Sequence, residues 1–368
     1  MGYSNEHHEP LQRSPSAGAG SGLRVVAIGG GTGLSTLLKG LKWYVSSSSD
    51  RPSAKAGKPE ISDLSAVVTV SDDGGSSGRL RKELNMLPPG DIRNCIVALS
   101  EDEALLSQLF QHRFEKGPGL EGHSFGNLFL AALTDITKDF SEAVRLSSEI
   151  LVTRGHIYPA TTANVELEAL MEDGTRVRGE TKITASKGRI KELFLIPKDV
   201  GPLPQTLEAI ARADLITIGP GSLFTSLIPN LLVRGIAQAI AASPATKVYI
   251  CNLMTQANES LGRTAADHIR ALNGHAQTRI CDYALLNRRS ISDQLKAKYA
   301  LEGATQVVVD EGAIEELGVC PVLGDYLDEG DVARHATARI ARDLVELAMQ
   351  ARSHERAVSK SHVASKKI

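Results

Sequence analysis

The chain has 368 residues, of which 42% are hydrophobic, and this length is enough to bury a large core. A formal net charge of −2 and an aromatic content of 4% argue against nucleic-acid binding. The four cysteines are widely separated, which disfavours a zinc site or a disulfide framework. We find neither a signal peptide nor an apolar run of membrane-spanning length, and we therefore expect a cytoplasmic protein.

Residues 1–21 form a polar segment rich in serine and glycine, which predicts a disordered arm. The apolar run Val25–Ile28 follows, then a cluster of glycines, then leucines at helical spacing, so we expect a strand, a tight turn and a helix. The unpaired N–H groups at the start of such a helix bind anions. The turn therefore predicts a phosphate contact at Gly30, Gly31, Thr32 and Gly33, with a turn that binds nothing as the alternative.

Two standard nucleotide motifs do not match this turn. The dinucleotide fingerprint requires a third glycine where this chain has Leu34, so an NAD-linked oxidoreductase ranks low among the candidate functions. The phosphate-binding lysine of the P-loop NTPases is missing, which disfavours an ATPase or a GTPase.

A second strand is predicted over Leu64–Val70, and the loop after it is rich in glycine, hydroxyl and charged residues. The candidate ligand-binding residues of this loop are Asp72, Asp73, Gly74, Ser76 and Arg79. The two adjacent carboxylates can hold Mg²⁺ or bind ribose hydroxyls, and the arginine can pair with a pyrophosphate. Helix capping by one of the aspartates is the alternative.

Helical spacing then runs from Asp91 to Ile136, which is longer than one crossover needs and predicts a helical cap beside the sheet. Asn127 lies in the first turn of one of these helices and is a candidate to hold a ligand hydroxyl. Between about residues 160 and 200, apolar residues alternate with charged ones around the turn Asp173-Gly174, which is typical of a small antiparallel β insertion.

A third unit of strand, turn and helix begins at Ala213–Ile218, and its turn contributes Gly219, Gly221 and Ser222 as candidates. The strand Lys247–Cys251 precedes two more candidates, Asn252 and Thr255. Further strands are expected at 283–286 and 306–309. Because ligands of open α/β sheets bind at the carboxyl ends of the strands, these turns predict one shared cleft for a nucleotide or another phosphorylated ligand.

This alternation of strands and helices predicts a Rossmann-like, doubly wound α/β fold with a mostly parallel sheet, the helical cap and the small antiparallel insertion. We place this domain at residues 22–330. Residues 331–368 are expected to form a C-terminal helix over Ala333–Met349 and a basic tail from Arg352 onward.

Several motifs, in one order along the chain, resemble those of the YvcK-type gluconeogenesis factors, which are related to the CofD phospholactate transferases. The resemblance runs from about Arg24 to Asp310 and rests on the segments Gly29–Gly33, Asp72–Arg81, Pro88–Asn94, Gly122–Leu128, Gly219–Ser226 and Cys251–Gln256. It implies a regulatory protein that is needed for cell shape on gluconeogenic carbon sources. It also implies a small-molecule nucleotide sugar as ligand, UDP-N-acetylglucosamine, and suggests a homo-oligomer with partners among the proteins of cell-envelope synthesis.

Relatives of this type often carry an aromatic residue at the position of Arg263, so the resemblance makes Arg263 a further candidate, through its guanidinium face. The chain shows no catalytic triad, nucleophile elbow or zinc-protease motif, so we assign no catalytic residue and expect binding without turnover. The alternative is a CofD-like transferase that acts on a nucleoside-diphosphate-linked phospholactate donor, with Mg²⁺ held by Asp72 and Asp73.

Overall fold

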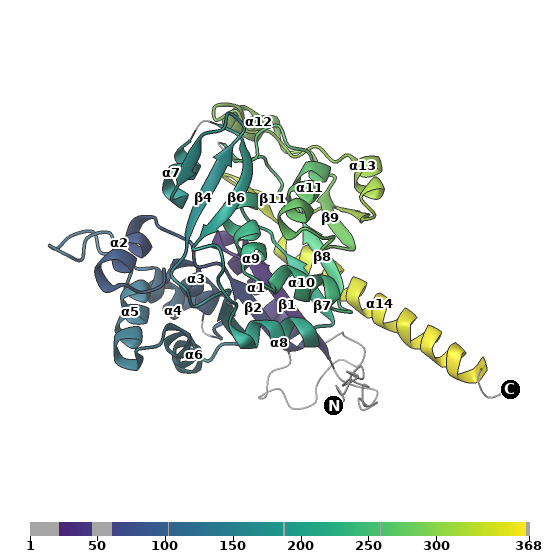
Figure 1. Cartoon of the computed structure of the whole chain (residues 1–368), viewed down its shortest axis with the longest axis horizontal. Coiled ribbons are helices and arrows are strands. Elements are labelled where there is room, and N and C mark those ends of the chain that lie inside the picture. Colours follow the sequence, from purple (N-terminus) through teal and green to yellow (C-terminus); the bar gives the residue numbers. More distant parts are fainter. Residues whose placement is uncertain (1–21, 46–60, 102, 187, 258, 366–368) are drawn as a thin grey trace, which may run out of the picture.

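A seven-stranded parallel sheet forms the centre of the computed structural model, which describes residues 22–45, 61–101, 103–186, 188–257 and 259–365 (Figure 1). From edge to edge the strands are β10 (Cys320–Gly324), β9 (Tyr283–Asn287), β8 (Thr246–Ile250), β7 (Leu215–Ile218), β1 (Leu23–Gly29), β2 (Ile61–Val68) and β3 (His156–Pro159). The central strands are continuous apolar runs because helices cover both faces of the sheet. The predicted doubly wound α/β fold is therefore confirmed.

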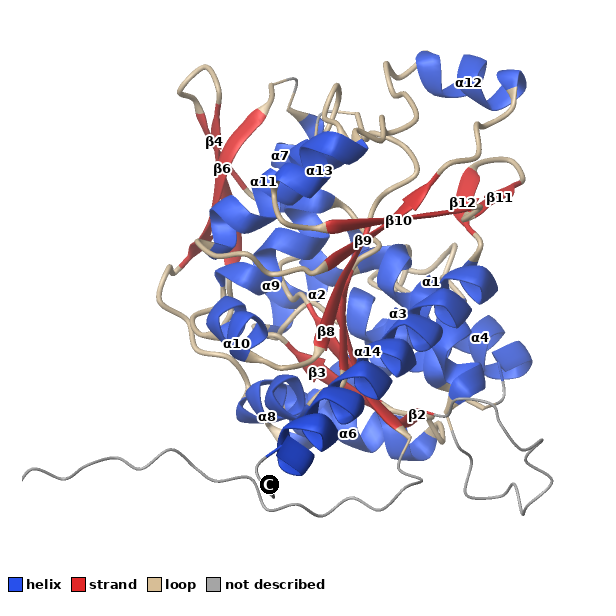
Figure 2. Ribbon diagram, turned by 90° about the vertical axis from the view of Figure 1, so that its right-hand side faces the viewer, coloured by secondary structure: helices blue, strands red, loops and turns tan. Residues whose placement is uncertain are grey.

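Helices α8 (Pro204–Arg212), α9 (Ile228–Leu232), α10 (Ile236–Ala242) and α11 (Ala265–Ala276) cover one face of the sheet (Figure 2). The other face is covered by α1 (Gly31–Leu41), α3 (Gly90–Leu99) and α14 (Thr337–Ser365). The predicted helical cap is α2 (Gly75–Leu84), α4 (Glu103–Gln111), α5 (Phe125–Thr137) and α6 (Phe140–Ile150), together with α3. Short helices α12 (Asp293–Ala300) and α13 (Glu311–Glu316) lie near the C-terminal strands.

The strand order reverses its direction of growth at β1. The chain moves outward from β1 to β2 and β3 on one side, then returns to the other side of β1 with β7, β8, β9 and β10. The carboxyl ends of β1 and β7 therefore flank a topological switch point, where open α/β sheets bind their ligands. The strand order brings the first glycine turn and the turn after β7 to this point.

The predicted antiparallel insertion is a three-stranded sheet of β4 (Glu166–Met171), β5 (Arg176–Arg178) and β6 (Ile190–Ile196), with the one-and-a-half-turn helix α7 (Glu180–Ala185). Its strand β4 alternates buried and half-buried residues along its whole length, as the sequence pattern predicts. Figure 1 shows this sheet standing above one end of the main sheet.

Three predicted features differ from the structure or fall outside it. No strand forms at 306–309, because backbone groups of this segment bond to the loops after β8 instead, as when the Val307 N–H donates to the Leu253 carbonyl. The C-terminal helix begins at Thr337 and continues to Ser365, since neither glycine nor proline interrupts the sequence there. A hairpin of β11 (Leu327–Glu329) and β12 (Ala333–His335) precedes it. The arm predicted at residues 1–21 lies outside the described residues.

Within the described part of the chain, no single helix is long and apolar enough to cross a membrane. One sharply bent pair of segments, Leu223–Leu232 with Ile236–Ala242, reaches the required length and composition together.

Candidate functional site

A pocket of about 650 Å³ lies at the carboxyl ends of β1, β7 and β8, at the topological switch point. It brings together eight of the residues that the sequence singles out: Gly30, Gly31, Thr32, Gly33, Gly221, Ser222, Asn252 and Thr255. These residues come from three separate loops. Two of the glycine-rich turns that were expected to share one cleft, those after β1 and β7, meet here with the loop after β8, whereas the loop Asp72–Arg81 does not line the pocket.

The first glycine turn is held in place by a carboxylate from another element. Gly31 has a positive φ of +61°, which glycine adopts without strain, and its N–H donates to Asp91 Oδ2 at 2.7 Å. Asp91 lies in the first turn of α3 and so caps α1 from a distance. The next two amides of α1, those of Thr32 and Gly33, have no partner among the described residues. They are the donors that this turn still offers to an anion.

Gly33 lies against the second turn so closely that a side chain would not fit. A Cβ atom at this position would stand 2.3 Å from the Pro220 carbonyl oxygen. The two turns that flank the switch point are thus in direct backbone contact.

The second turn is also capped by a carboxylate. The N–H groups of Phe224 and Thr225, at the start of the helical turn Leu223–Leu227, donate to Glu259 Oε1 at 2.8 and 2.9 Å. Burial raises the pKa of Glu259, and the two N–H donors oppose that rise. Glu259 therefore lies where a ligand phosphate would bind at this helix start.

The loop after β8 closes the third side of the pocket. Asn252 Oδ1 accepts a long hydrogen bond of 3.4 Å from the Gly221 N–H. The Thr255 hydroxyl exchanges hydrogen bonds with the backbone of Thr305, so it fixes the loop rather than pointing free donors into the pocket. Gln256 donates to the Ser222 hydroxyl at 2.9 Å, while its own buried Oε1 has no partner among the described residues. The oxygen is thus an unsatisfied buried acceptor on a residue that lines the pocket.

Several residues of the pocket wall were not predicted, and the most distant of them in the sequence include Glu180, Tyr299 and His335. Glu180 comes from the β insertion, and the other two come from α12 and β12. A small separate core that includes Leu253, Leu295 and Leu327 holds α12 and the β11–β12 hairpin against the loop after β8. No local motif marks these residues, because only the packing of the C-terminal elements brings them to the pocket.

Burial lowers the pKa of His335, so its ring is neutral near pH 7, and Nε2 lies 3.0 Å from the Cys251 carbonyl oxygen. Because that oxygen can only accept, Nε2 carries the proton. His335 therefore ties the hairpin to the end of β8.

The other eight predicted site residues do not line the pocket: Asp72, Asp73, Gly74, Ser76, Arg79, Asn127, Gly219 and Arg263. Gly219 is close, since its N–H donates to the Ile28 carbonyl and so pairs β7 with β1. The other seven take part in other contacts, and their roles in ligand binding stay predictions.

Asp73 joins the cap to the insertion. Its Oδ1 accepts hydrogen bonds from the Thr181 N–H at 2.8 Å and from the Thr181 hydroxyl at 2.6 Å. Asp72 Oδ1 accepts from the Gly74 N–H at 2.9 Å, which closes a turn within the loop. Asp73 thus caps a helix, which is the alternative predicted for one of the two aspartates, although that helix is α7 and not the next one in the chain.

Ser76, Asn127 and His123 form a buried polar cluster between α2 and α5. The Ser76 hydroxyl lies 2.9 Å from His123 Nδ1 and accepts from Asn127 Nδ2 at 3.1 Å. Arg79 is exposed and donates to the Glu121 carbonyl. Arg263 lies over the Phe224 ring at 5.2 Å and donates to the Ile190 carbonyl at 2.7 Å, so it fastens β6 to the main domain.

Asp72, Asp91 and Glu180 form an acidic cluster beside the first turn. Burial raises the pKa of Glu180 well above its ordinary value, and the charges of Asp72 and Asp91 raise it further. Even so, no three metal-binding side chains stand in ligating positions in the described part of the chain. Thr181 already donates to Asp73 Oδ1, and a role of Asp72 and Asp73 in holding Mg²⁺ stays a prediction.

Replacing Asp91 by asparagine is expected to raise stability at neutral pH. Burial raises the pKa of Asp91 from 3.8 to about 6, and repulsion from Asp72 adds to this. The stabilising contribution of the neutral Asp91 carboxyl is therefore fully present below about pH 4, and it is lost as the pH rises through about 6. The amide still accepts from the Gly31 N–H, so Asp91→Asn should gain about 1–2 kcal/mol at pH 7, since the carboxyl partly reaches the surface.

The measurement is urea unfolding at several pH values between about 4 and 8. Asp91→Asn should flatten the fall in unfolding free energy over this range, whereas the exposed control Asp331→Asn should leave it unchanged. An identical slope in both variants would show that Asp91 does not titrate in this way.

Known proteins resemble this chain over most of its length. The sequence profile described as 2-phospho-L-lactate transferase CofD matches residues 25–327. A protein named gluconeogenesis factor from Halalkalibacterium halodurans is 51% identical over 324 residues, which cover 88% of this chain and 95% of that protein. The gluconeogenesis factor of Bacillus subtilis strain 168 is 49% identical over 326 residues, which cover 88% of this chain and 98% of that protein. A crystal structure of a protein from Bacillus halodurans superposes with a TM-score of 0.82 at 50% identity, covering 88% of this chain and 100% of that one.

Proposed function

We propose, from the premise that this chain belongs to the CofD/YvcK family of gluconeogenesis factors, that it binds UDP-N-acetylglucosamine and acts as a regulatory protein without consuming it. The observation that carries this proposal is the meeting of three predicted loops in one pocket at the topological switch point. The volume of about 650 Å³ suits a ligand of nucleotide size.

The pyrophosphate of such a ligand would lie at the first glycine turn. The unpartnered amides of Thr32 and Gly33 offer donors there, with the positive end of the α1 dipole behind them. The pocket wall itself carries Glu180 and Glu302 and includes no lysine or arginine among the described residues. Backbone donors, rather than side-chain cations, would therefore bind the phosphates. This favours a ligand with few charges, such as a nucleotide sugar, over a triphosphate.

The uracil base would stack on Tyr299. Apart from His335, Tyr299 is the one aromatic residue of the pocket wall, and its hydroxyl accepts from the Ala333 N–H at 3.1 Å, which fixes the ring against the hairpin. Gln256 Oε1 is a buried acceptor without a partner in the described structure, and uracil N3–H is a donor that would satisfy it. A guanine base offers two donors on the corresponding edge, so one lone acceptor suits uracil better.

In this proposal the protein senses a cell-wall precursor in the cytoplasm and supports cell shape during growth on gluconeogenic carbon sources. Absence of turnover is proposed because the two candidate bases are engaged: His335 is committed to the Cys251 carbonyl, and Glu259, beside the Ser222 and Thr225 hydroxyls, accepts from two backbone N–H groups. The alternative is a transferase like the CofD enzymes, and the matching profile favours it.

The test is to incubate the purified protein with UDP-N-acetylglucosamine, with and without Mg²⁺, and to follow both binding by calorimetry and nucleotide integrity by chromatography. We expect saturable binding and intact ligand. Release of UDP or UMP would place the chain among the transferases, and preference for GDP or NAD would contradict the proposed ligand.

Tyr299→Ala should weaken binding by roughly 10- to 100-fold, since stacking on an aromatic ring contributes about 1–3 kcal/mol per base. Tyr299→Phe is the matched control, because it keeps the ring and loses only the hydroxyl. In a host that lacks its own gluconeogenesis factor, Tyr299→Phe should restore cell shape and Tyr299→Ala should not.

A further inference from the structure

A second groove, of about 860 Å³, lies along the free edge of the main sheet and shares no residue with the nucleotide pocket. Its base is the edge strand β3. One wall is the polar face of α6, and the other is the start of α8 at Leu203 and Gln205. A smaller cavity between β3 and α8 continues it, since His156, Tyr158 and Gln205 line both.

The edge strand offers unpaired backbone groups to this groove. The Ala160 N–H donates to the Val68 carbonyl of β2, and peptide groups alternate in direction along a strand. The peptide groups of Ile157 therefore point away from β2, and neither has a partner among the described residues. One residue of an extended chain can pair with both of them.

Three residues that line the groove carry either a strained backbone angle or a buried hydroxyl without a partner. Val152 is a β-branched residue at φ +46°, a conformation such residues rarely adopt, and it is 58% exposed. The hydroxyls of Ser141 and Ser148, two turns apart on α6, are shielded from solvent and have no partner in the described structure. An occupant of the groove would cover the valine side chain.

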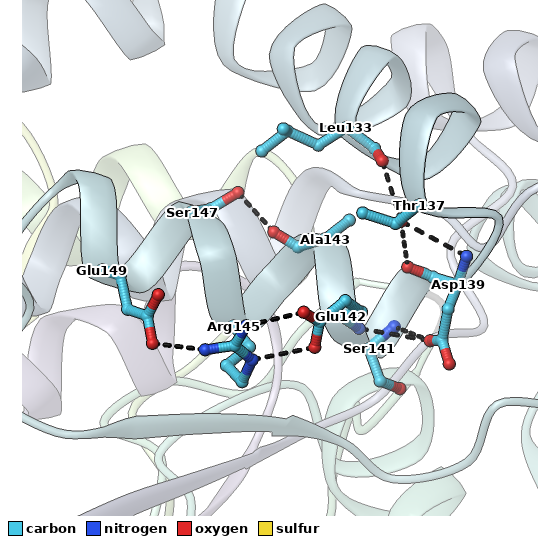
Figure 3. Close-up of polar contacts among 9 residues, drawn as sticks. All are labelled: Leu133, Thr137, Asp139, Ser141, Glu142, Ala143, Arg145, Ser147 and Glu149. Atoms are coloured by element: carbon cyan, nitrogen blue, oxygen red, sulfur yellow. Dashed lines mark hydrogen bonds and ion pairs between the residues drawn. The ribbon is translucent and has the colours of Figure 1, made fainter.

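The groove wall is acidic. Arg145 pairs with both Glu142, at 2.6 Å, and Glu149, so one cation is shared by two carboxylates (Figure 3). Asp139 caps α6 through Oδ1, which accepts from the Ser141 and Glu142 N–H groups at 2.7 and 3.2 Å. The wall keeps a net negative charge, which favours a basic occupant.

We propose that this groove binds an extended segment of another protein, with alternating apolar and basic residues, by adding it as a short strand beside β3. The pairing is limited to a few residues, because β3 has four residues and ends at Pro159, which lacks an N–H. Main-chain bonds to Ile157 would give the register, Val152 would contact an apolar side chain, and the glutamates of α6 would hold the basic ones. This site is independent of the proposed nucleotide function.

The experiment uses the full chain and a fluorescent peptide, acetyl-Lys-Val-Lys-Val-Thr-Lys-Val-amide, with binding followed by anisotropy. Hydrogen exchange should show that the peptide protects the Ile157 amide. The same peptide with every residue's backbone nitrogen methylated keeps its charge but loses the main-chain N–H donors of its residues, and it should not bind. Equal binding of the two peptides, no binding of either, or binding without protection of Ile157 would each overturn the proposal.

Val152→Asn tests the groove without damage to the fold, because asparagine tolerates positive φ. We expect about tenfold weaker peptide binding with no fall in melting temperature. Leu301→Asn, at a residue that is 88% exposed outside the groove, is the matched control and should bind the peptide normally. If Val152→Asn instead dissociates a homodimer in gel filtration, the occupant is a second copy of the chain and the proposed partner is wrong.

Discussion

Replacing Gly33 by alanine is expected to destabilise the protein by about 1–3 kcal/mol and to abolish the proposed nucleotide binding. The added Cβ would stand 2.3 Å from the Pro220 carbonyl oxygen and 3.0 Å from the Gly221 Cα. These are backbone atoms, so no side chain can turn away to make room. The start of α1 and the turn after β7 would have to separate, and the amides of Thr32 and Gly33 would lose their position at the switch point.

The matched control is Gly274→Ala in α11. A Cβ at Gly274 meets nothing within 4 Å, so this variant should gain about 0.5–1 kcal/mol from the higher helix propensity of alanine. Urea unfolding gives the stability of both variants, and calorimetry with UDP-N-acetylglucosamine gives the affinity. A Gly33→Ala protein with unchanged stability and affinity would show that the two turns do not need this contact.

Replacing Glu259 by alanine is expected to cost about 2–4 kcal/mol of stability. Its carboxylate is the acceptor for the buried N–H groups of Phe224 and Thr225, and removal of the side chain would leave both donors without a partner. Because the turn Gly221–Ser222 leads directly into this helical start, the pocket should lose ligand affinity as well.

Glu259→Gln separates the hydrogen bonds from the charge. The glutamine oxygen can still accept from both N–H groups, and removal of a buried charge whose pKa is raised by burial should leave stability at pH 7 equal or higher. Thermal unfolding of the two variants measures their stabilities and shows whether the hydrogen bonds or the charge stabilise the turn. If Glu259→Gln is as unstable as Glu259→Ala, the negative charge at this helix start is what holds the turn.

The local parts of the architecture could be read from the sequence. The turn at Gly29–Gly33 follows a β-branched run and precedes a leucine helix, and the pattern around Asp173-Gly174 alternates with period two. Such patterns depend only on residues that are close in the sequence, so they can be recognised without knowledge of the fold. For this reason the sequence predicted the parallel sheet, the antiparallel insertion and three loops of the pocket.

The tertiary structure decided which groups at those loops are free. Asp91 caps Gly31 across 60 residues of sequence, and Glu259 caps Phe224 across 35, so one amide at the start of α1 and the amides after Ser222 are already paired with carboxylates. Tyr299 reaches the pocket only because a small separate core holds α12 against the loop after β8. These contacts depend on strand order and on long-range packing, which residue patterns do not encode. The sequence by itself determined where loops able to bind a ligand occur, and packing across the switch point determined which of their donors remain for a ligand.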